Sequence, residues 1–249
     1  MFKSWRLGRV LGFPVDINLS FILLLGFVLL AYGGLVGVLV ICIAFGSVLL
    51  HELGHAVVAR RFGVHVAGIE LSFFGGAAKM TQSPREPGHE IAIAAAGPAV
   101  SLVLGGLGLG LGGMFGSPFV AMIGWINFVI AGFNLIPALP MDGGRILRAA
   151  LAYRFDHVRA TDLAVVVARA FTIGFGVFGL ATGMLQLVLL APFLWMMTTH
   201  EQRVAHAGRD WGSPFDPRSH VHDPFARGAV RRYAVRHRNG RLEIEPLDR

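Results

Sequence analysis

Six long apolar segments dominate this chain of 249 residues. Short polar or glycine-rich stretches separate them. A helix needs about 20 apolar residues to cross the hydrocarbon core of a bilayer, and the six segments approach or exceed that length. The pattern therefore predicts six transmembrane helices, at approximately 18–33, 35–58, 90–113, 119–140, 163–182 and 184–199.

The connection between the second and third apolar segments follows a different period. From Gly63 to Met80 apolar and polar residues alternate, and Gly75-Gly76 lies within this stretch. Alternation is typical of a strand with one buried face, and paired glycines favour a tight turn. We expect a small membrane-associated β-hairpin here, with a simple linker as the alternative. The fold class is then an all-α polytopic membrane protein of about six transmembrane helices, with this hairpin between spans two and three.

Composition agrees with a membrane protein. Hydrophobic residues make up 54% of the chain and charged residues only 15%, and the mean hydropathy is +0.62. These values argue against a soluble protein and make the lipid bilayer the expected surroundings. The net charge of +7 does not indicate nucleic acid, because the basic residues lie beside the predicted spans and in the tail, without a nucleic-acid-binding motif.

Basic residues also predict the topology. The connections near 32–35, 112–118 and 183 contain no Lys or Arg, whereas the other connections and both ends of the chain are basic. The positive-inside rule then places both termini in the cytoplasm. We expect a transmembrane core at 1–200 and a basic, flexible or partly ordered cytoplasmic tail at 201–249, where no period is sustained.

The motif His51-Glu52-Leu53-Gly54-His55 lies at the end of the second apolar segment. Ionisable groups are costly inside a membrane and need partners. On a helix, positions i and i+4 share one face, so both imidazoles can reach one Zn²⁺ while Glu52 lies beside a metal-bound water. The motif predicts a hydrolytic zinc site. The alternative is two structural histidines that bond to neighbouring helices.

A catalytic zinc usually has three protein ligands, so one more is needed. Asp142 is the strongest candidate, because it follows the fourth span in a segment with Pro137, Pro140 and Gly143-Gly144. The prolines interrupt helical hydrogen bonding and the glycines permit a close backbone approach, so a carboxylate could reach the metal on a non-helical stretch. The alternative is that Asp142 caps the N-terminus of the following helix.

Together these motifs resemble those of the site-2 protease family of intramembrane zinc metalloproteases. His51-Glu52-Leu53-Gly54-His55 is similar to the family's zinc-helix motif, and Asn134 to Gly144 is similar to its second motif of Asn, Pro and Asp-Gly. The similarity extends to Gly97-Pro98 in the third span and to Gly75-Gly76 in the hairpin, and covers most of residues 1–200.

The resemblance implies one Zn²⁺ per chain, bound by His51, His55 and Asp142. It also implies that Glu52 is the general base and that Asn134 hydrogen-bonds the oxyanion or the substrate backbone. The implied activity is that of a zinc metalloendopeptidase that cuts a membrane-spanning or membrane-associated protein in or near its transmembrane segment, in a prokaryotic cell (inner) membrane.

One further expectation follows from the resemblance: an amide side chain near position 101, where this chain has Ser101. A helical substrate must unwind locally to be cut. The alternation and the paired glycines motivate the hypothesis that the edge of the hairpin from Ile69 to Ala78 receives it as an added strand. Two other functions remain open: a membrane metal-binding or metal-transport protein using the same ligands, and an inactive scaffold. The position of Glu52 beside His51 argues against both.

Overall fold

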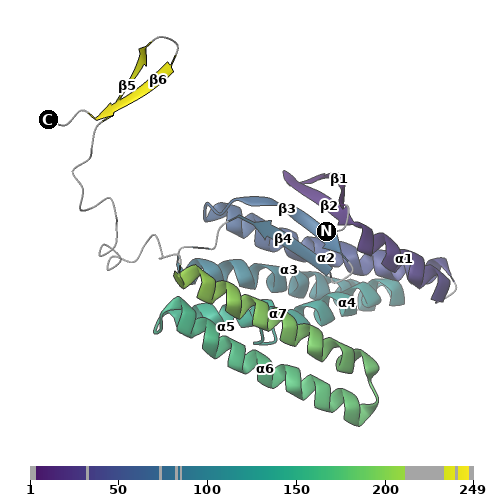
Figure 1. The fold of residues 1–249 in the computed structure, drawn as a ribbon. Coiled ribbons are helices and arrows are strands. Elements are labelled where there is room, and N and C mark those ends of the chain that lie inside the picture. The colour runs from purple at the N-terminus through teal and green to yellow at the C-terminus, as the bar shows by residue number, and fades with distance from the viewer. Residues whose placement is uncertain are drawn as a thin grey trace. The chain divides into compact units, whose positions relative to one another are not determined.

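The computed structural model describes residues 4–31, 34–72, 75–81, 84, 86–210, 233–238 and 241–246. The chain forms two compact units, 1–203 and 204–249. Within the described residues, the first unit combines a bundle of helices with a four-stranded sheet (Figure 1).

Helices form at all six segments that were predicted to span the membrane. They are α1 (Leu19–Ala31), α2 (Leu35–Arg61), α3 (Pro87–Met114), α4 (Pro118–Asn134), α6 (His157–Thr182) and α7 (Leu185–Asp210). In the described part of the chain, three of them, α2, α3 and α6, are both long and apolar enough to cross a membrane. Helix α1 has only 13 residues and α4 has 17. The total of six spans therefore stays a prediction.

Local sequence explains where several helices begin and end. Helices α3 and α4 both have proline in the first turn, where the missing N–H costs no hydrogen bond. Helix α6 begins after Asp156, whose carboxylate accepts a hydrogen bond from the Arg159 N–H. It ends at Gly183, which adopts a left-handed conformation with φ of 70°.

The predicted β-hairpin between spans two and three is confirmed. Strands β3 (Val66–Ser72) and β4 (Gly75–Met80) pair antiparallel. The glycine pair is not the turn itself, because Gly75 and Gly76 belong to β4 and pair with Ser72 and Leu71. Strand β4 lies at the edge of the sheet, whose order is β1-β2-β3-β4.

The all-α expectation was wrong for the beginning of the chain, where a second hairpin completes the sheet. Strands β1 (Ser4–Val10) and β2 (Phe13–Asn18) pair antiparallel, and β2 pairs parallel with β3. The signal was present: Phe13 and Val15 are buried on one face of β2, and the turn at Leu11 and Gly12 has positive φ at both residues. In the sequence, the basic residues of this segment were interpreted only as a signal of membrane topology.

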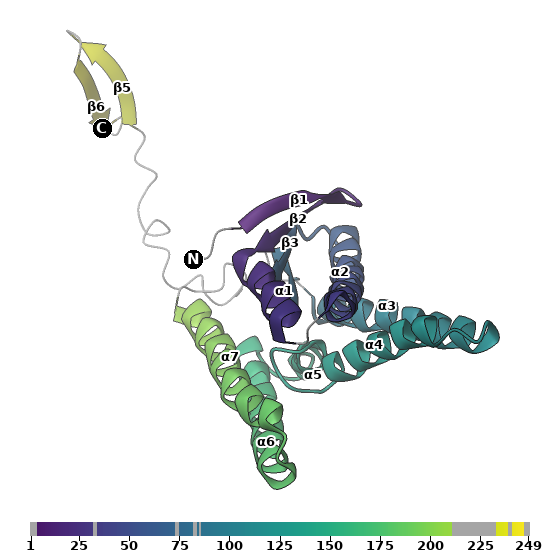
Figure 2. The same cartoon turned by 90° about the vertical axis from the view of Figure 1, so that its right-hand side faces the viewer.

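The sheet packs against α2, through contacts of β3 and β4 with this helix (Figure 2). Apolar side chains from β2, β3, α2 and α3 form one core. Its buried members are Phe13, Leu53, Ala56, Ala59, Val64, Val66, Ile69 and Ile93. Because β4 also contacts α2, the free edge of the sheet lies against the helix that carries the histidine motif.

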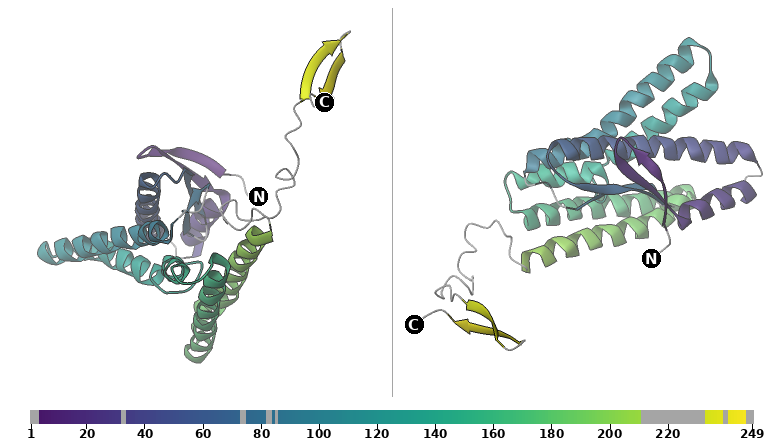
Figure 3. Two further views of the ribbon diagram at one scale, coloured as in Figure 1. Left: turned by 90° about the vertical axis from the view of Figure 1, so that its left-hand side faces the viewer. Right: turned by 90° about the horizontal axis from the view of Figure 1, so that it is seen from above.

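Helices α3 and α4 form an antiparallel pair through small residues (Figure 3). A Cβ added at Gly108 would lie 2.6 Å from the Cα of Gly124, and one at Gly112 would lie 2.5 Å from the backbone N of Ala121. Only glycine permits this approach, which is a common way for membrane helices to pack. Helix α5 (Asp142–Ala152) packs between α3 and α6.

The second unit contains a two-stranded antiparallel sheet, β5 (Tyr233–Arg238) and β6 (Arg241–Pro246). This hairpin was not expected, because the tail sequence showed no sustained period. Helix α7 also continues ten residues into the stretch assigned to the tail, ending at Asp210. The rest of the predicted tail, 211–232, 239–240 and 247–249, lies outside the described residues.

Candidate metal centre

Helix α2 carries both histidines of the motif into the protein interior. His51 is 2% exposed and His55 is 3% exposed. Their rings lie 4.8 Å apart between centroids, as the i, i+4 spacing on one helix face requires. Helix α2 therefore presents two adjacent imidazoles to one small volume.

Asp142 approaches the same volume from the start of α5. It is buried, at 6% exposure, and it is the first residue of the helix, where Met141 occupies the N-cap position and no side-chain cap is made. The alternative interpretation of Asp142 as an N-cap is therefore wrong. The carboxylate is free to point toward α2.

Close backbone packing brings Asp142 into this position. A Cβ at Gly143 would lie 2.3 Å from the carbonyl oxygen of Leu135, and one at Gly144 would lie 2.3 Å from the backbone N of Leu139. The loop 135–141 thus folds directly onto the first turn of α5. The buried Thr198 hydroxyl on α7 donates to the Leu139 carbonyl at 2.8 Å and anchors the loop.

Three potential ligand atoms converge at this point. Asp142 Oδ2 lies 3.0 Å from His51 Nε2 and 3.2 Å from His55 Nε2. Two imidazole nitrogens and one carboxylate oxygen form a donor set typical of catalytic zinc. The structure thus brings together the three residues that the sequence predicted as ligands, from two elements that are far apart along the chain.

The hydrogen bond of His55 Nδ1 determines which form of its other nitrogen, Nε2, faces Asp142. His55 Nδ1–H donates to the Ile93 carbonyl at 2.7 Å, because a carbonyl can only accept. In the neutral imidazole, the lone pair of His55 Nε2 then points at the carboxylate of Asp142. Two acceptors at 3.2 Å repel each other unless a proton or a cation lies between them. Zinc meets this requirement.

His51 has a similar second partner, since its Nδ1 lies 2.9 Å from the Ser101 hydroxyl oxygen. Ser101 is fully buried on α3. Metal-binding histidines almost always have such a partner, which fixes the orientation of the ring. A serine therefore stands in contact with His51 at the position where an amide was expected.

Gly97 on α3 makes room for both rings. A Cβ at this position would lie 2.2 Å from His55 Nε2 and 2.6 Å from His51 Nε2. No side chain of any size fits there. Helix α3 therefore meets the two imidazoles with bare backbone at Gly97.

The carboxylate of Asp142 is ionised at neutral pH. Burial alone would raise its pKa, but hydrogen bonding and charge from His51 and His55 outweigh that effect and lower the pKa to about 2. An anionic oxygen between two imidazoles is the form in which a carboxylate binds a metal.

Glu52 lies beside these residues. Ligand atoms of His51, Glu52 and His55 lie within 4.8 Å of one another. The Glu52 carboxylate accepts a hydrogen bond of 3.0 Å from the Ala78 N–H of β4, and Gly76 of the same strand leaves room for its side chain, since a Cβ there would lie 2.8 Å from Glu52 Cγ. The edge strand therefore orients this carboxylate.

Asn134, at the end of α4, makes a local contact. Its amide donates to the Ile130 carbonyl at 3.0 Å, four residues earlier on the same helix. Among the described residues, no hydrogen bond connects Asn134 with the two histidines or Asp142. Its predicted role toward substrate stays a prediction.

Sequence reasoning missed two groups that orient the functional side chains: the Ile93 carbonyl, which contacts His55, and the Ala78 N–H, which contacts Glu52. Both are backbone groups, which no residue type reveals. Ser101 was noted in the sequence only as a departure from an expected amide, and its contact with His51 was not predicted.

Comparison with known proteins agrees with this geometry. A family model for peptidase family M50 matches residues 39–118 and 113–175. A zinc metalloprotease of Methanocaldococcus jannaschii is 34% identical over 209 residues, which is 81% of this chain and 61% of that protein. The stage IV sporulation protein FB of Bacillus subtilis is 27% identical over 164 residues, 64% of this chain and 57% of that protein. The chain therefore spans about three fifths of the length of these two relatives.

A solved structure also matches. The site-2 protease from Methanocaldococcus jannaschii superposes with a TM-score of 0.65 at 32% sequence identity, covering 80% of this chain and 95% of that chain.

Proposed function

This chain belongs to peptidase family M50, the site-2 protease family, and from that premise we propose that it is a zinc-dependent intramembrane endopeptidase. It hydrolyses peptide bonds in or near a transmembrane segment of a membrane-spanning or membrane-associated protein. The zinc metalloprotease relative and the structural match to a site-2 protease support this function.

One observation carries the proposal: Asp142 Oδ2 lies 3.0 Å from His51 Nε2 and 3.2 Å from His55 Nε2. The opposed lone pairs of His55 and the carboxylate require a positive charge between them. The donor set suits Zn²⁺, and the buried partners of the two Nδ1 atoms suit a preorganised site. These three side chains would therefore hold one zinc ion per chain.

Bound zinc would act as a Lewis acid, activating a water molecule for attack and polarising the scissile carbonyl. Glu52 takes the proton from this water and returns it to the leaving amine. The Ala78 N–H keeps the carboxylate in place beside the two histidines. Asn134 would leave its bond with the Ile130 carbonyl to donate to the oxyanion or to the substrate backbone.

Strand β4 is the proposed binding edge for the substrate. It is one of the two outer strands of the sheet, and the Ala78 N–H points away from β3, since it donates to Glu52. An unwound substrate segment can pair with such an edge by strand addition. Pairing would place its backbone beside the candidate zinc ligands.

We also propose six membrane crossings, with both ends of the chain in the cytoplasm of a prokaryotic cell, a transmembrane core at 1–200 and a basic tail at 201–249. Membrane-spanning apolar helices support an integral membrane protein. The basic residues Arg60 and Arg61 end helix α2, so the metal site lies toward the cytoplasmic side.

Metal transport with the same ligands is the second candidate. It predicts zinc flux across a vesicle and no role for Glu52 as a base. The contact between Glu52 and the edge strand favours hydrolysis, because a transport site gains nothing from a carboxylate bonded to a strand that can bind peptide.

The test is cleavage of a transmembrane reporter by the purified protein in detergent, for wild type, Glu52→Gln and Glu86→Gln. Glu86 is a matched control, because its side chain is 72% exposed. We expect cleavage by wild type and Glu86→Gln and none by Glu52→Gln. Zinc uptake into vesicles without cleavage of any reporter would favour transport.

A further inference from the structure

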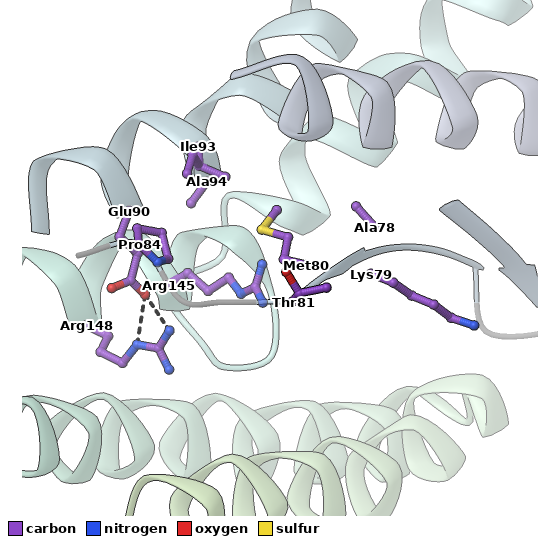
Figure 4. A pocket seen from close by; sticks show the side chains of 10 residues that line it. All are labelled: Ala78, Lys79, Met80, Thr81, Pro84, Glu90, Ile93, Ala94, Arg145 and Arg148. Atoms are coloured by element: carbon purple, nitrogen blue, oxygen red, sulfur yellow. Dashed lines mark hydrogen bonds and ion pairs between the residues drawn. The ribbon is translucent and has the colours of Figure 1, made fainter. Parts of the chain in front are cut away.

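A pocket of about 420 Å³ adjoins the metal centre on the side of the edge strand. It is lined by residues of β4 and the segment after it, of α3 and of α5 (Figure 4). These residues are Ala78, Lys79, Met80, Thr81, Pro84, Glu90, Ile93, Ala94, Arg145 and Arg148.

Two lining residues connect the pocket with the candidate catalytic groups. The Ala78 N–H donates to the Glu52 carboxylate at 3.0 Å, and the Ile93 carbonyl accepts from His55 Nδ1 at 2.7 Å. A peptide that pairs with β4 beside Ala78 and continues along the strand toward Met80 would reach this pocket. The pocket would then be the next part of the proposed substrate path.

The described lining residues include three basic side chains, and two of them are neutralised by carboxylates of the protein. Lys79 forms an ion pair with Glu70, whose pKa is lowered by the hydrogen bonds from Lys79 and Asn18. Arg148 pairs with Glu90 and, at 3.5 Å, with Glu201.

Arg145 is the exception. Its side chain is half-buried and extends across the pocket toward Met80 and Thr81, away from the paired Arg148 and Glu90 (Figure 4). Among the described residues, its guanidinium has no hydrogen bond or ion pair, and its backbone N–H donates to the Met141 carbonyl. Within the described part of the chain, one positive charge without an anionic partner therefore faces the proposed substrate path.

We propose that this pocket binds an acidic side chain of the extended substrate, held by Arg145, and that the enzyme accordingly prefers Asp or Glu at that substrate position. The inference rests on the proposed peptidase function and names the substrate class. A guanidinium matches a carboxylate in geometry as well as in charge. Partial burial reduces the screening by water that weakens exposed pairs.

Strand geometry locates the preferred position. Arg145 reaches the pocket wall at Met80 and Thr81, two to three residues beyond Ala78, which is about 7 to 10 Å along a strand. An added strand runs at the same spacing. The acidic residue should therefore lie about two to three residues from the substrate residue that pairs beside Ala78.

The experiment compares transmembrane reporters in which a single Asp, or Asn as its neutral equivalent, is moved along the segment on both sides of the scissile bond. The enzymes are the full chain as wild type, Arg145→Gln, Arg145→Lys, Arg145→Glu and Arg154→Gln. Arg154 is an exposed matched control that follows α5 and does not line the pocket. Cleavage is measured in a zwitterionic detergent, with and without added phosphatidylglycerol.

We expect wild type and Arg154→Gln to cut the reporter with Asp at one position about tenfold faster than the Asn reporter, the size of one hydrogen bond to a charged group. Arg145→Gln should cut the two reporters equally while keeping its activity on the Asn reporter. Arg145→Lys should restore part of the preference, and Arg145→Glu should favour a Lys reporter.

Three results of this experiment would overturn the proposal. The first is a wild type without any preference for Asp. The second is an Arg145→Gln variant that loses activity equally on Asp and Asn reporters, which would make Arg145 structural. Stimulation by phosphatidylglycerol that depends on Arg145, without a peptide preference, would assign the pocket to a lipid headgroup and would likewise refute it.

A measurement of peptide binding distinguishes a failure of this inference from a failure of the proposed function. If wild type cuts no reporter, the affinities of fluorescent Asp and Asn peptides for the full chain are measured by anisotropy. An Arg145-dependent preference for the Asp peptide supports the pocket assignment even when catalysis fails, and equal affinities refute it.

Discussion

The substitution Gly97→Ala adds one methyl group at the point where α3 meets both candidate zinc ligands of α2. The new Cβ would lie 2.2 Å from His55 Nε2, 2.5 Å from His55 Cε1 and 2.6 Å from His51 Nε2. Nonbonded carbon atoms are normally at least about 3.5 Å from such neighbours. The shortfall at His55 is therefore about 1.3 Å, and the ring must rotate or the two helices must separate.

A zinc site tolerates only small displacements of its ligands. Ligand distances in zinc sites are held to within about 0.2 Å, and disturbing even the partners of zinc ligands reduces affinity by about 10- to 100-fold. A ligand displaced by more than 1 Å should cost at least about 100-fold in zinc affinity, or roughly 2.8 kcal/mol. We therefore expect Gly97→Ala to lose zinc and cleavage together.

The assay is titration of the purified protein with a competing chelator, followed by reporter cleavage in excess zinc. Gly106→Ala is the matched control, because it makes the same change on the same helix where no atom lies within 4 Å of the new Cβ. It should bind zinc and cut like wild type. Wild-type zinc affinity in Gly97→Ala would refute the reasoning, because two imidazoles and a methyl group cannot share that space.

Three further changes test other contacts. Ser101→Ala removes the hydroxyl that lies 2.9 Å from His51 Nδ1, so zinc affinity measured by chelator competition should fall about 10- to 100-fold. An unchanged affinity would show that this hydroxyl does not orient the ring. Ala78→Pro removes the N–H that donates to Glu52 but leaves the pairing with β3, so cleavage should fall about tenfold at constant zinc content. Ala78→Gly keeps this N–H and should not reproduce the loss. Gly108→Ala places a Cβ 2.6 Å from the facing backbone of α4 and should lower the free energy of unfolding by about 1 to 3 kcal/mol. Gly110→Ala is the control, because the space around that position is open; equal thermal stability of the two variants would contradict the close packing of α3 and α4.

Much of the helical architecture could be predicted from the sequence. A run of apolar residues predicts a helix even when the packing of that segment is unknown, because a membrane-spanning backbone must satisfy its hydrogen bonds within the helix. All six expected segments are helical, and alternation correctly predicted strand β3. Their lengths were less predictable: α1 ends after 13 residues, so apolarity alone does not establish a span.

The sheet was predicted only in part, because β2 and β3 pair across 54 positions of the chain, as in the pair Val15 with Ile69. No local pattern reveals such a partner. The short strand of Phe13 and Val15 resembled the start of an apolar span, and its basic neighbours had another explanation. Long-range pairing resolved that ambiguity.

The candidate ligands were predictable, whereas the groups around them were not. His51, Glu52 and His55 form a local motif, and Asp142 could be found because zinc needs a third ligand and few carboxylates lie near the spans. The Ala78 N–H and the space left at Gly97 depend on how separate elements meet. Arg145 showed no signal in the sequence beyond its charge, because only the structure reveals that the described residues around it offer it no carboxylate partner.

The most direct test of the central claim is the zinc content of purified wild type, Glu52→Gln and Asp142→Asn, measured side by side by mass spectrometry after dialysis against a weak chelator. The proposed centre predicts one zinc per chain in wild type and in Glu52→Gln, because Glu52 acts on the water and does not hold the metal, and little or none in Asp142→Asn. Full zinc occupancy in Asp142→Asn, or no zinc in wild type, would contradict the proposed metal site.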